Sequence, residues 1–275
     1  SETFISSIVL IVAAVPEGLP TIVAASLAIN IIKMAKEKAL VKNLIASETV
    51  GAINIICSDK TGTLTENKMT VVKVFQENRF INPEEVSSEK LLTNFAINST
   101  AHLESSENGI QQFIGRPTEC ALLIVHDHRD KEGYLEKRKD AEITFIYPFS
   151  SEEKNMTTIL HEYDKTIAYT KGSTEKIISL CSKVMTKEGP VDLNVHIKDI
   201  EEQVHYFENQ AMRLIGFAHR ELKESYDFGD DRREIEKEMI FDGFVVIKDP
   251  IRKEVYGAIN SCRDAGIGIK MLTGD

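Results

Sequence analysis

The stretch that most constrains this chain is residues 55–65, with the sequence IICSDKTGTLT. Residues 52–57 form an apolar run with the length and branched composition of a buried strand, and Asp59 follows at its end. Ligands of open parallel sheets collect at the carboxyl ends of the strands, so we expect Asp59 to face a substrate. An aspartate carboxylate can attack phosphorus and form an acyl phosphate.

The residues after Asp59 suit a phosphate group. Gly62 lets the backbone approach a phosphate, and the hydroxyls of Thr61 and Thr63 can hydrogen-bond its oxygens. A strand that ends in an Asx-type turn is the alternative interpretation. The complete run after an apolar strand favours a phosphate site with Asp59 as the nucleophile.

Length and charge narrow the classes of protein. A chain of 275 residues has room for two domains with cores of their own. Its net charge of −10 argues against nucleic acid as a partner. The four cysteines lack metal-finger spacing and fit a reducing cytosol. The chain starts without Met and stops at Asp275, so we expect it to be a piece of a longer protein.

The N-terminal residues predict an interrupted membrane helix over 1–32. Residues 4–15 and 21–32 are apolar, and PEGLP separates them. Neither half reaches the roughly 20 apolar residues of a spanning helix, whereas the two together do. Lysines at 33, 36, 38 and 42 follow directly, and positive charge beside a span marks the cytoplasmic side. A signal peptide lacks support because the basic start is missing, and a buried hairpin of a soluble protein is the other alternative.

The interruption predicts an ion site. Proline removes an amide donor, so we expect the carbonyls of Val12, Ala13 and Val15 to be free beside the carboxylate of Glu17. Hard cations such as Ca²⁺ take oxygen ligands of this kind. An ionisable residue inside a membrane segment is a functional candidate by default.

A stalk helix over 33–50 and an inserted domain over 70–242 are expected next. The insert contains helical patterns at 84–101, 118–128, 174–184 and 196–212, and strand patterns at 143–149, 156–163, 166–171 and 214–219. Three of these strands are consecutive and close together, which predicts an antiparallel sheet with helices packed on it. Charge-rich stretches at 104–108, 132–140 and 223–233 are interpreted as loops or solvated faces.

Two strand ends in the insert could contact a nucleotide. Phe149 ends an apolar strand before a polar run, so its ring suits stacking on a purine at a polar rim; a core Phe is the alternative. Lys171 and Gly172 end another strand beside a helix start, which suits contact with a phosphate or a ring. A common turn is the alternative there.

The last segment predicts a βαβ unit beside the strand of Asp59. Its strands lie at 244–247 and 267–272, and its helix at 253–265 ends at Gly266. We expect the Thr273 hydroxyl and the Gly274 amide to donate to a transferred phosphoryl group. Arg252 or Lys60 would offset its charge. A strand-end turn and a surface cation are the alternatives.

Several motifs resemble those of P-type ATPases, the ion pumps that form a phospho-aspartate. DKTGTLT resembles their phosphorylation signature, and DPIR and MLTGD resemble their hinge and phosphate-binding motifs. VAAVPEGLP looks like the unwound fourth transmembrane helix of calcium-transporting members. Sodium/potassium pumps usually carry Asn where Ala14 stands and Leu where Pro20 stands, so the resemblance favours calcium.

The resemblance implies an incomplete Rossmann-like, haloacid-dehalogenase-type phosphorylation domain (51–69 and 243–275) with an inserted α+β nucleotide-binding domain. It implies that Mg²⁺ binds at Asp59 and Thr61, and that the transported Ca²⁺ binds at Glu17 and the carbonyls named above. It also implies an ATP pocket lined by Glu119, Phe149, Lys154, Lys171, Gly172, Arg213 and Asp275. Ser151 replaces a frequent Arg, and Ser173-Thr174 replaces a usual Ala-Pro.

The expected parent is therefore a multi-pass membrane protein with cytoplasmic nucleotide and phosphorylation domains. Its partners would be ATP, a cation, the lipid bilayer, and the actuator domain and other transmembrane helices, which we do not find in this chain. Three alternatives stay open: a pump for Na⁺/K⁺ or Mn²⁺, a soluble Asp-nucleophile phosphohydrolase, and a nucleotide-binding module without catalysis. Phosphohydrolases typically have Asp where Thr61 stands, which favours a long-lived phospho-aspartate.

Overall fold

A computed structural model describes residues 2–105, 111–162, 164–223 and 232–272. Contacts divide the chain into two compact units. The first unit contains residues Ser1–Lys60 and Arg252–Asp275, and the second contains Thr61–Ile251. The chain is thus a mixed α/β protein in which one unit interrupts the sequence of the other.

The first unit begins with one continuous helix, α1 (Glu2–Lys36). The predicted interruption is therefore wrong for the backbone. A proline inside a helix removes only one amide donor, and the neighbouring turns can keep their hydrogen bonds. In a continuous helix the prolines at 16 and 20 leave only the carbonyls of Val12 and Pro16 without helical donors, four residues earlier. Within α1, residues Gly18–Lys36 are apolar and long enough to cross a membrane.

The stretch predicted as one stalk helix is divided. α1 ends at Lys36, and α2 covers only Leu44–Gly51. Lys38 adopts a left-handed backbone (φ 63°), and the amide of Ala39 donates to the carbonyl of Met34 at 2.9 Å. Such a left-handed residue closes the last helical turn and prevents its continuation.

Two parallel strands form the rest of the first unit with one helix. β1 (Ile55–Asp59) pairs with β13 (Gly268–Leu272), and Asp59 is opposite Leu272. α9 (Lys253–Asp264) precedes β13 and ends before Gly266, whose φ of 72° is a left-handed conformation that glycine adopts without strain. The predicted helix, its glycine end and the parallel pairing are confirmed.

The predicted third strand of that sheet is wrong. Residues 244–247 belong to β12 (Met239–Lys248), which lies in the second unit and pairs antiparallel with β11 (Arg213–Leu222) and β2 (Thr70–Gln76). A short apolar run fits the centre of any buried sheet, so its composition does not identify its neighbours. Its pairing with β2, which is distant in the sequence, and with β11 places this run in the second unit.

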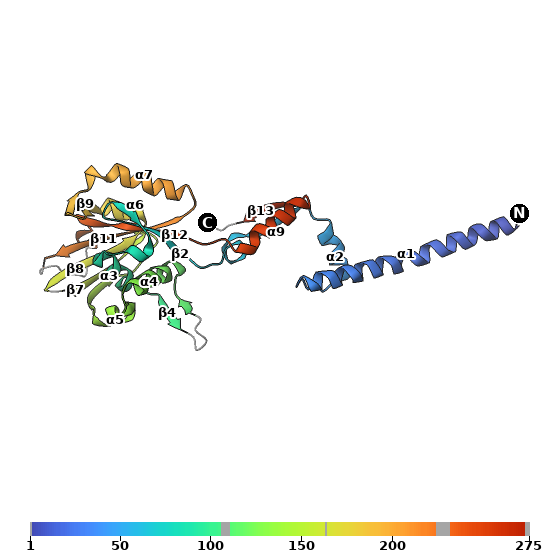
Figure 1. Ribbon diagram of the computed structural model, residues 1–275, viewed down its shortest axis with the longest axis horizontal. Helices are drawn as coiled ribbons and strands as arrows, with labels where there is room; N and C mark the ends of the chain where they lie inside the picture. The colour runs from blue at the N-terminus through green and yellow to red at the C-terminus, as the bar shows by residue number, and fades with distance from the viewer. Residues whose placement is uncertain (1, 106–110, 163, 224–231, 273–275) are drawn as a thin grey trace. The chain divides into compact units, whose positions relative to one another are not determined.

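The second unit is built on a nine-stranded sheet (Figure 1). Its main path is β10-β9-β12-β11-β8-β7-β6, and β2 and β3 extend it beside β12. The antiparallel neighbours β6, β7 and β8 confirm the predicted arrangement. The strands not yet bounded are β3 (Arg79–Ile81), β6 (Glu142–Tyr147), β7 (Asn155–Glu162), β8 (Lys165–Gly172), β9 (Cys181–Thr186) and β10 (Gly189–Asp192). A separate hairpin consists of β4 (His102–Ser105) and β5 (Gln111–Ile114).

Helices cover both faces of this sheet (Figure 1). On one face, Phe95 and Leu122 pack with Phe217 and Val245; on the other, Ile177 and Ile200 belong to a second core cluster. The first face carries α3 (Glu89–Ile97), α4 (Pro117–Arg129) and α5 (Gly133–Asp140). The second carries α6 (Thr174–Leu180) and α7 (Ile197–Glu208). Short helical turns are η2 (Pro83–Glu85), η3 (Leu193–Val195) and α8 (Arg232–Ile235), whereas η1 (Lys60–Leu64) is a turn with non-helical backbone at Thr61 and Gly62.

Two predicted elements differ from the structure. The helix expected over 174–184 ends at Leu180, and β9 starts at Cys181. The stretch 132–140, interpreted as a charged loop or solvated face, contains α5, in which Tyr134 is buried. Arg138 donates to the carbonyls of Ala96, Ser99 and Ala101, so a long cation stabilises the neighbouring helix end.

Candidate functional site

One edge of the large sheet gathers the residues predicted to bind a nucleotide. Gly172 ends β8, and its register partners are Asn155 at the start of β7 and Gly216 of β11. Phe149 therefore follows β6, Lys154 precedes β7 and Arg213 begins β11 at this same edge. The structure brings these residues together from four segments of the second unit. We call this region, at one end of strands β6, β7, β8 and β11, the sheet edge.

The sheet edge also contains both connections of the second unit. β2 begins where β12 ends, because Thr70 is the register partner of Lys248. Two hydrogen bonds join the segments that lead from these strands to the ends of the second unit. The Thr65 hydroxyl donates to the Asp249 carboxylate at 2.6 Å, and the Glu66 amide donates to the Pro250 carbonyl at 2.9 Å. These hydrogen bonds hold the two connections together next to the candidate nucleotide residues.

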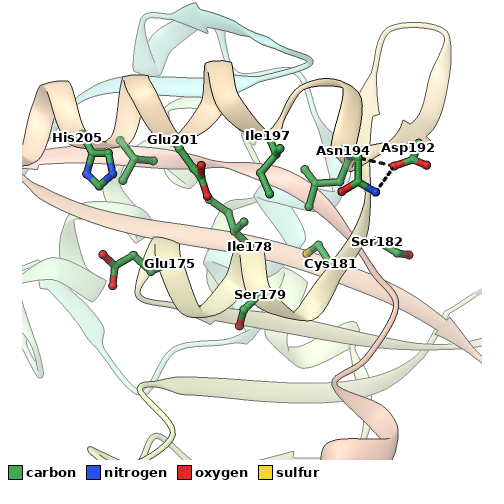
Figure 2. Close-up of a pocket in the computed structure, with 12 residues that line it drawn as sticks. Glu175, Ile178, Ser179, Cys181, Ser182, Asp192, Asn194, Ile197, Glu201 and His205 are labelled. Atoms are coloured by element: carbon green, nitrogen blue, oxygen red, sulfur yellow. Dashed lines mark hydrogen bonds between the residues drawn. The ribbon is translucent and has the colours of Figure 1, made fainter.

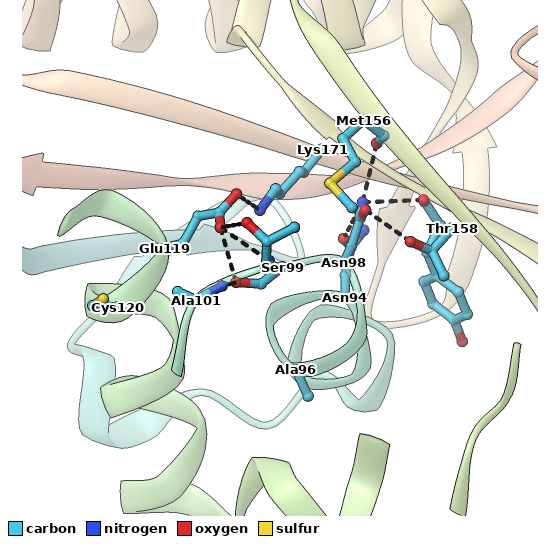
Figure 3. A network of polar contacts seen from close by, with 12 residues as sticks. Asn94, Ala96, Asn98, Ser99, Ala101, Glu119, Cys120, Met156, Thr158 and Lys171 are labelled. Carbon is cyan, nitrogen blue, oxygen red and sulfur yellow. Dashed lines mark hydrogen bonds and ion pairs between the residues drawn. The ribbon is translucent and has the colours of Figure 1, made fainter. Parts of the chain in front are cut away.

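A buried ion pair lies behind the sheet edge (Figure 3). Nζ of Lys171 is 2.7 Å from Oε1 of Glu119, and each residue is only 6% exposed. The other Glu119 oxygen accepts from the Thr100 amide and hydroxyl, both at 3.1 Å, and from the Ser99 hydroxyl at 3.2 Å. Glu119 lies in the first turn of α4, where the helix dipole favours a negative charge. Both oxygens of the Glu119 carboxylate are therefore hydrogen-bonded.

The charge state of Glu119 follows from its partners. Burial alone raises the pKa of this carboxyl, but the Lys171 ammonium and the donors of Thr100 outweigh burial and hold the pKa below its usual range. Glu119 is therefore a carboxylate that orients the Lys171 ammonium at the end of β8. An oriented buried cation suits a phosphate or the face of an aromatic ring.

Two asparagines that sequence reasoning missed support the same strands (Figure 3). The Asn98 amide donates to the carbonyls of Met156 at 3.1 Å and Tyr169 at 3.2 Å, and it accepts from the Thr158 hydroxyl at 3.0 Å. Asn94 donates to the Thr170 carbonyl at 3.1 Å. The signal was available, since Asn94 and Asn98 lie four residues apart on the helical face that includes buried Leu91.

Phe149 is at a rim and not in the core, because 40% of it is exposed. The Arg116 guanidinium lies 4.5 Å from the centroid of its ring, a cation–π arrangement. Arg116 is the N-cap of α4, three residues before Glu119. Sequence reasoning gave Arg116 no role in the site; its place directly before Pro117 and Glu119 was the available signal.

The loop before β7 packs directly on Gly172. Lys154 has a left-handed backbone (φ 55°), its amide donates to the Ser150 carbonyl at 2.9 Å, and its carbonyl accepts from the Ser173 amide at 3.1 Å. A Cβ at Gly172 would lie 2.5 Å from the Lys154 carbonyl oxygen, which is too close for any side chain. Gly172 is therefore required for the approach of the two segments.

The predicted phosphorylation residues are divided among three parts of the chain. Asp59 is exposed at the carboxyl end of β1 and Lys60 follows it, while Arg252 is the N-cap of α9; all three belong to the first unit. Thr61 starts the second unit. The remaining three predicted residues, Thr273, Gly274 and Asp275, lie outside the described residues.

The predicted metal ligands lie partly outside the described residues. Among the residues that the structure describes, no group of three or more His, Cys, Asp or Glu side chains could hold a metal ion. The side chains of residues 13–17, with Ala13, Val15 and Glu17 among them, lie outside the described part. Asp59 supplies one exposed carboxylate, which suits Mg²⁺ shared with substrate phosphates and water.

A groove of about 640 Å³ lies elsewhere on the second unit (Figure 2). Apolar residues such as Ile178 and Val204 and polar residues such as Glu175 and Asn194 line it, from α6, β9, η3 and α7. None of its lining residues was predicted, and no cation comparable to Lys171 points into it among those residues. We assign the site to the sheet edge because the buried ion pair and the exposed aromatic ring meet there.

Comparison with known proteins identifies the family. The model of the P-type ATPase cytoplasmic domain N matches residues 87–254. This match covers more than half of the chain, so the chain belongs to the P-type ATPases.

Curated relatives match the whole chain. It is 41% identical to calcium-transporting ATPase PAT1 of Dictyostelium discoideum, over 100% of this chain and 25% of the relative. It is 35% identical to plasma membrane calcium-transporting ATPase 4 of Homo sapiens, over 99% of this chain and 23% of the relative. It is 34% identical to calcium-transporting ATPase 1 of Bacillus cereus, over 100% of this chain and 30% of the relative. The chain thus spans about a quarter to a third of the length of these relatives.

Proposed function

We propose that this chain is the nucleotide-binding and phosphorylation part, with one membrane helix, of an ATP-driven calcium pump. The sheet edge is the observation that supports this function best. An exposed aromatic ring, two exposed cations and an oriented buried ammonium meet there, beside the two connections that lead to Asp59 and Arg252. The names of the curated relatives support calcium as the transported ion.

In this proposal each residue at the sheet edge has a separate role. The Phe149 ring stacks on the purine, and Lys171, oriented by Glu119, contacts the purine ring or the phosphates. Gly172 allows the close approach of the Lys154 loop, and Lys154 and Arg213 neutralise phosphate charge. Asp275 would contribute to the same nucleotide.

The proposed reaction transfers the terminal phosphoryl group of ATP to Asp59. A carboxylate oxygen of Asp59 forms a bond to the γ-phosphorus while the bond to the β,γ-bridging oxygen breaks, and ADP leaves. Lys60 or Arg252, Thr273 and Gly274 would stabilise the charge on the transferred group. Asp59 and Thr61 would hold Mg²⁺, which offsets phosphate charge when bound. A Rossmann-like, haloacid-dehalogenase-type domain around β1 and β13 is part of this proposal.

Calcium would bind within α1. Glu17 and the Val12 carbonyl are the ligands that a continuous helix offers, because Pro16 has no amide hydrogen to donate to that carbonyl. Roles for the Ala13 and Val15 carbonyls require the helix to open there in another conformation. The bilayer would surround α1 in a multi-pass parent, with the nucleotide and phosphorylation domains on the cytoplasmic side.

The test is phosphorylation of the full-length protein with γ-labelled ATP. The proposal predicts an acid-stable, hydroxylamine-sensitive label that requires calcium and disappears in Asp59→Asn. Asp264→Asn, an exposed aspartate in the same unit, is the matched control and should label normally. Label that persists in Asp59→Asn would contradict the nucleophile. Label that follows sodium or manganese and ignores calcium would contradict the ion.

A further inference from the structure

We propose that Glu236 and Arg232 are positioning residues. They hold the loop of residues 148–154, which we call the Lys154 loop, in the conformation that binds the nucleotide. They act from the face of the sheet opposite to the Glu119–Lys171 pair. This inference rests on the proposed function, because it assumes that Lys154 and Gly172 contact ATP. Neither Glu236 nor Arg232 belongs to the residues assigned to the pocket above. We call these two residues the clip.

Glu236 uses both carboxylate oxygens inside the protein. The residue is only 4% exposed. Its Oε2 accepts from the Asn155 amide at 2.9 Å, and its Oε1 accepts from the Thr157 hydroxyl at 2.5 Å and from Nε of Arg232 at 2.7 Å. A buried carboxylate with three donors is fixed in one geometry.

Arg232 extends the clip to the backbone of the loop. Its Nη2 donates to the Asn155 carbonyl at 2.9 Å and to the Asn155 side-chain oxygen at 2.8 Å. Its guanidinium lies 5.7 Å from the centroid of the Tyr147 ring, which ends β6. The clip therefore holds both strands that flank the segment from Pro148 to Lys154.

The clip and the ion pair act from opposite faces of the sheet. Side chains alternate along a strand, so Asn155 and Thr157 lie on one face of β7, while Thr158, which contacts Asn98, lies on the other. On β8 the Thr170 hydroxyl meets the Thr157 hydroxyl at 2.7 Å, and Lys171 points to Glu119. The clip therefore does not need to contact the ligand.

Asn155 transmits the constraint to the pocket. It directly follows Lys154, and a Cβ at Gly172 would lie 2.7 Å from the Asn155 Cβ. The Lys154 carbonyl also accepts from the Ser173 amide at 3.1 Å. A shift of Asn155 would therefore move Lys154 and the turn after β8 together.

The buried charges suit positioning better than stability. Burying an ion pair costs desolvation that its attraction roughly offsets, so apolar residues of similar volume would stabilise the sheet equally well. A further tie of the loop, the Glu153–Lys176 pair at 2.9 Å, is partly exposed and hence weak. We therefore expect loss of the clip to reduce ATP affinity by more than the accompanying loss of folding stability explains.

The experiment is calorimetric titration of Mg²⁺ and ATP into the 275-residue chain in detergent, with melting temperatures measured in parallel. Glu236→Gln should weaken ATP binding about tenfold. In a Lys154→Ala background the same substitution should cause no further loss, because the clip acts through Lys154. Asp242→Asn is the matched control, since Asp242 is a buried carboxylate 3% exposed in β12, and it should keep the affinity of the unaltered chain.

Arg232→Lys provides a second variant if Glu236→Gln fails to fold. It keeps the charge and removes the paired donors to Asn155, so ATP should bind about threefold more weakly. Unchanged affinity in the folded variants, or independent losses in the double variant, would overturn the positioning role alone. No ATP binding by the unaltered chain, or ATP binding that Lys171→Ala leaves unchanged, would overturn the proposed nucleotide site and the clip with it.

Discussion

The two units differ in how their strands are covered. In the second unit, Phe217 of β11 and Phe244 of β12 are fully buried, and helices pack on both faces of the sheet. In the first unit, Ile55 of β1 and Met271 and Leu272 of β13 are 56–57% exposed. α9 has no buried residues. The proposed nucleotide residues therefore lie on a sheet that is packed on both faces, whereas the predicted nucleophile lies on a strand pair that is largely exposed.

This difference separates two physical requirements. Parallel strands are normally covered on both faces, and a two-stranded sheet has little stability of its own. An ATP pocket needs several side chains held in fixed positions, and the buried network behind β8 supplies this. The proposed nucleophile must be accessible to the phosphoryl group, and the exposed position of Asp59 at the end of β1 meets this requirement. We therefore expect the units to differ in stability and in their sensitivity to mutation.

The largest expected effect is in hydrogen exchange of the 275-residue chain. Amides of β8, β11 and β12 should exchange at least about a thousandfold more slowly than those of β1 and β13, because core amides open only with the whole unit. Mass spectrometry of peptides from these strands measures the difference. Equal protection in β1 and β11 would remove the contrast between the units.

Core truncation should separate the units next. Phe217→Ala removes a fully buried ring that packs at 4.9 Å on the ring of Phe95, so unfolding free energy should fall by about 3–5 kcal/mol. Met271→Ala, at a residue 57% exposed, should change it by less than about 0.5 kcal/mol. Urea denaturation followed by circular dichroism tests both. A large loss for Met271→Ala would show that β13 is packed after all.

The acids Glu119 and Asp59 offer a matched pair. Glu119→Ala leaves the Lys171 ammonium buried without its partner and should cost about 3 kcal/mol of stability together with ATP affinity. Asp59→Asn, at an exposed residue, should leave stability within about 0.5 kcal/mol. Denaturation and ATP titration on the same samples measure both effects. Equal stability losses would mean that Asp59 is also structural.

The pH dependence of the second unit should follow Glu119. Its pKa is lowered in the folded state from an ordinary value of 4.5, so its stabilising contribution is present above that pH and is lost as the pH falls through the folded value. Glu119→Gln should therefore flatten the loss of stability below about pH 4.5. Denaturant titrations across acidic pH test this, and an unchanged acid limb would contradict the assignment.

The smallest effect is expected where the ends of the second unit meet. Thr65→Val removes the 2.6 Å hydrogen bond to Asp249 and should cost about 1 kcal/mol. Thr63→Val, at an exposed residue two positions earlier, is the control and should be neutral. A neutral Thr65→Val would mean that the connection is held by the backbone bridge to Ile251 alone.

Local patterns predicted what depends on neighbours in the sequence. The parallel pairing of β1 with β13, the glycine end of α9 and the antiparallel run β6 to β8 followed from periodicity and turn residues. The sheet membership of β12 did not, because an apolar run of four residues fits either sheet. α1 continues through Pro16, where local breakers predicted an interruption.

The candidate site was predictable to a similar extent. Phe149 and Gly172 were visible as strand ends with suitable chemistry, Lys154 was assigned by resemblance alone, and the register places all three at one edge. Asn98 could have been found from its four-residue spacing to Asn94, whereas Glu236 could not, since a charged residue in a charged segment is usually solvated. Their roles depend on partners 58 and 81 residues away, which only the folded sheet brings into contact.

The central claim is that the sheet edge, not the groove of Figure 2, binds ATP. The most direct test is nuclear magnetic resonance of the isotope-labelled 275-residue chain during titration with ATP and Mg²⁺. The account predicts that the backbone amide signals of Lys154, Gly172 and Arg213 shift in a saturable way. Shifts confined to Ser179 and Asn194 in the groove would contradict it.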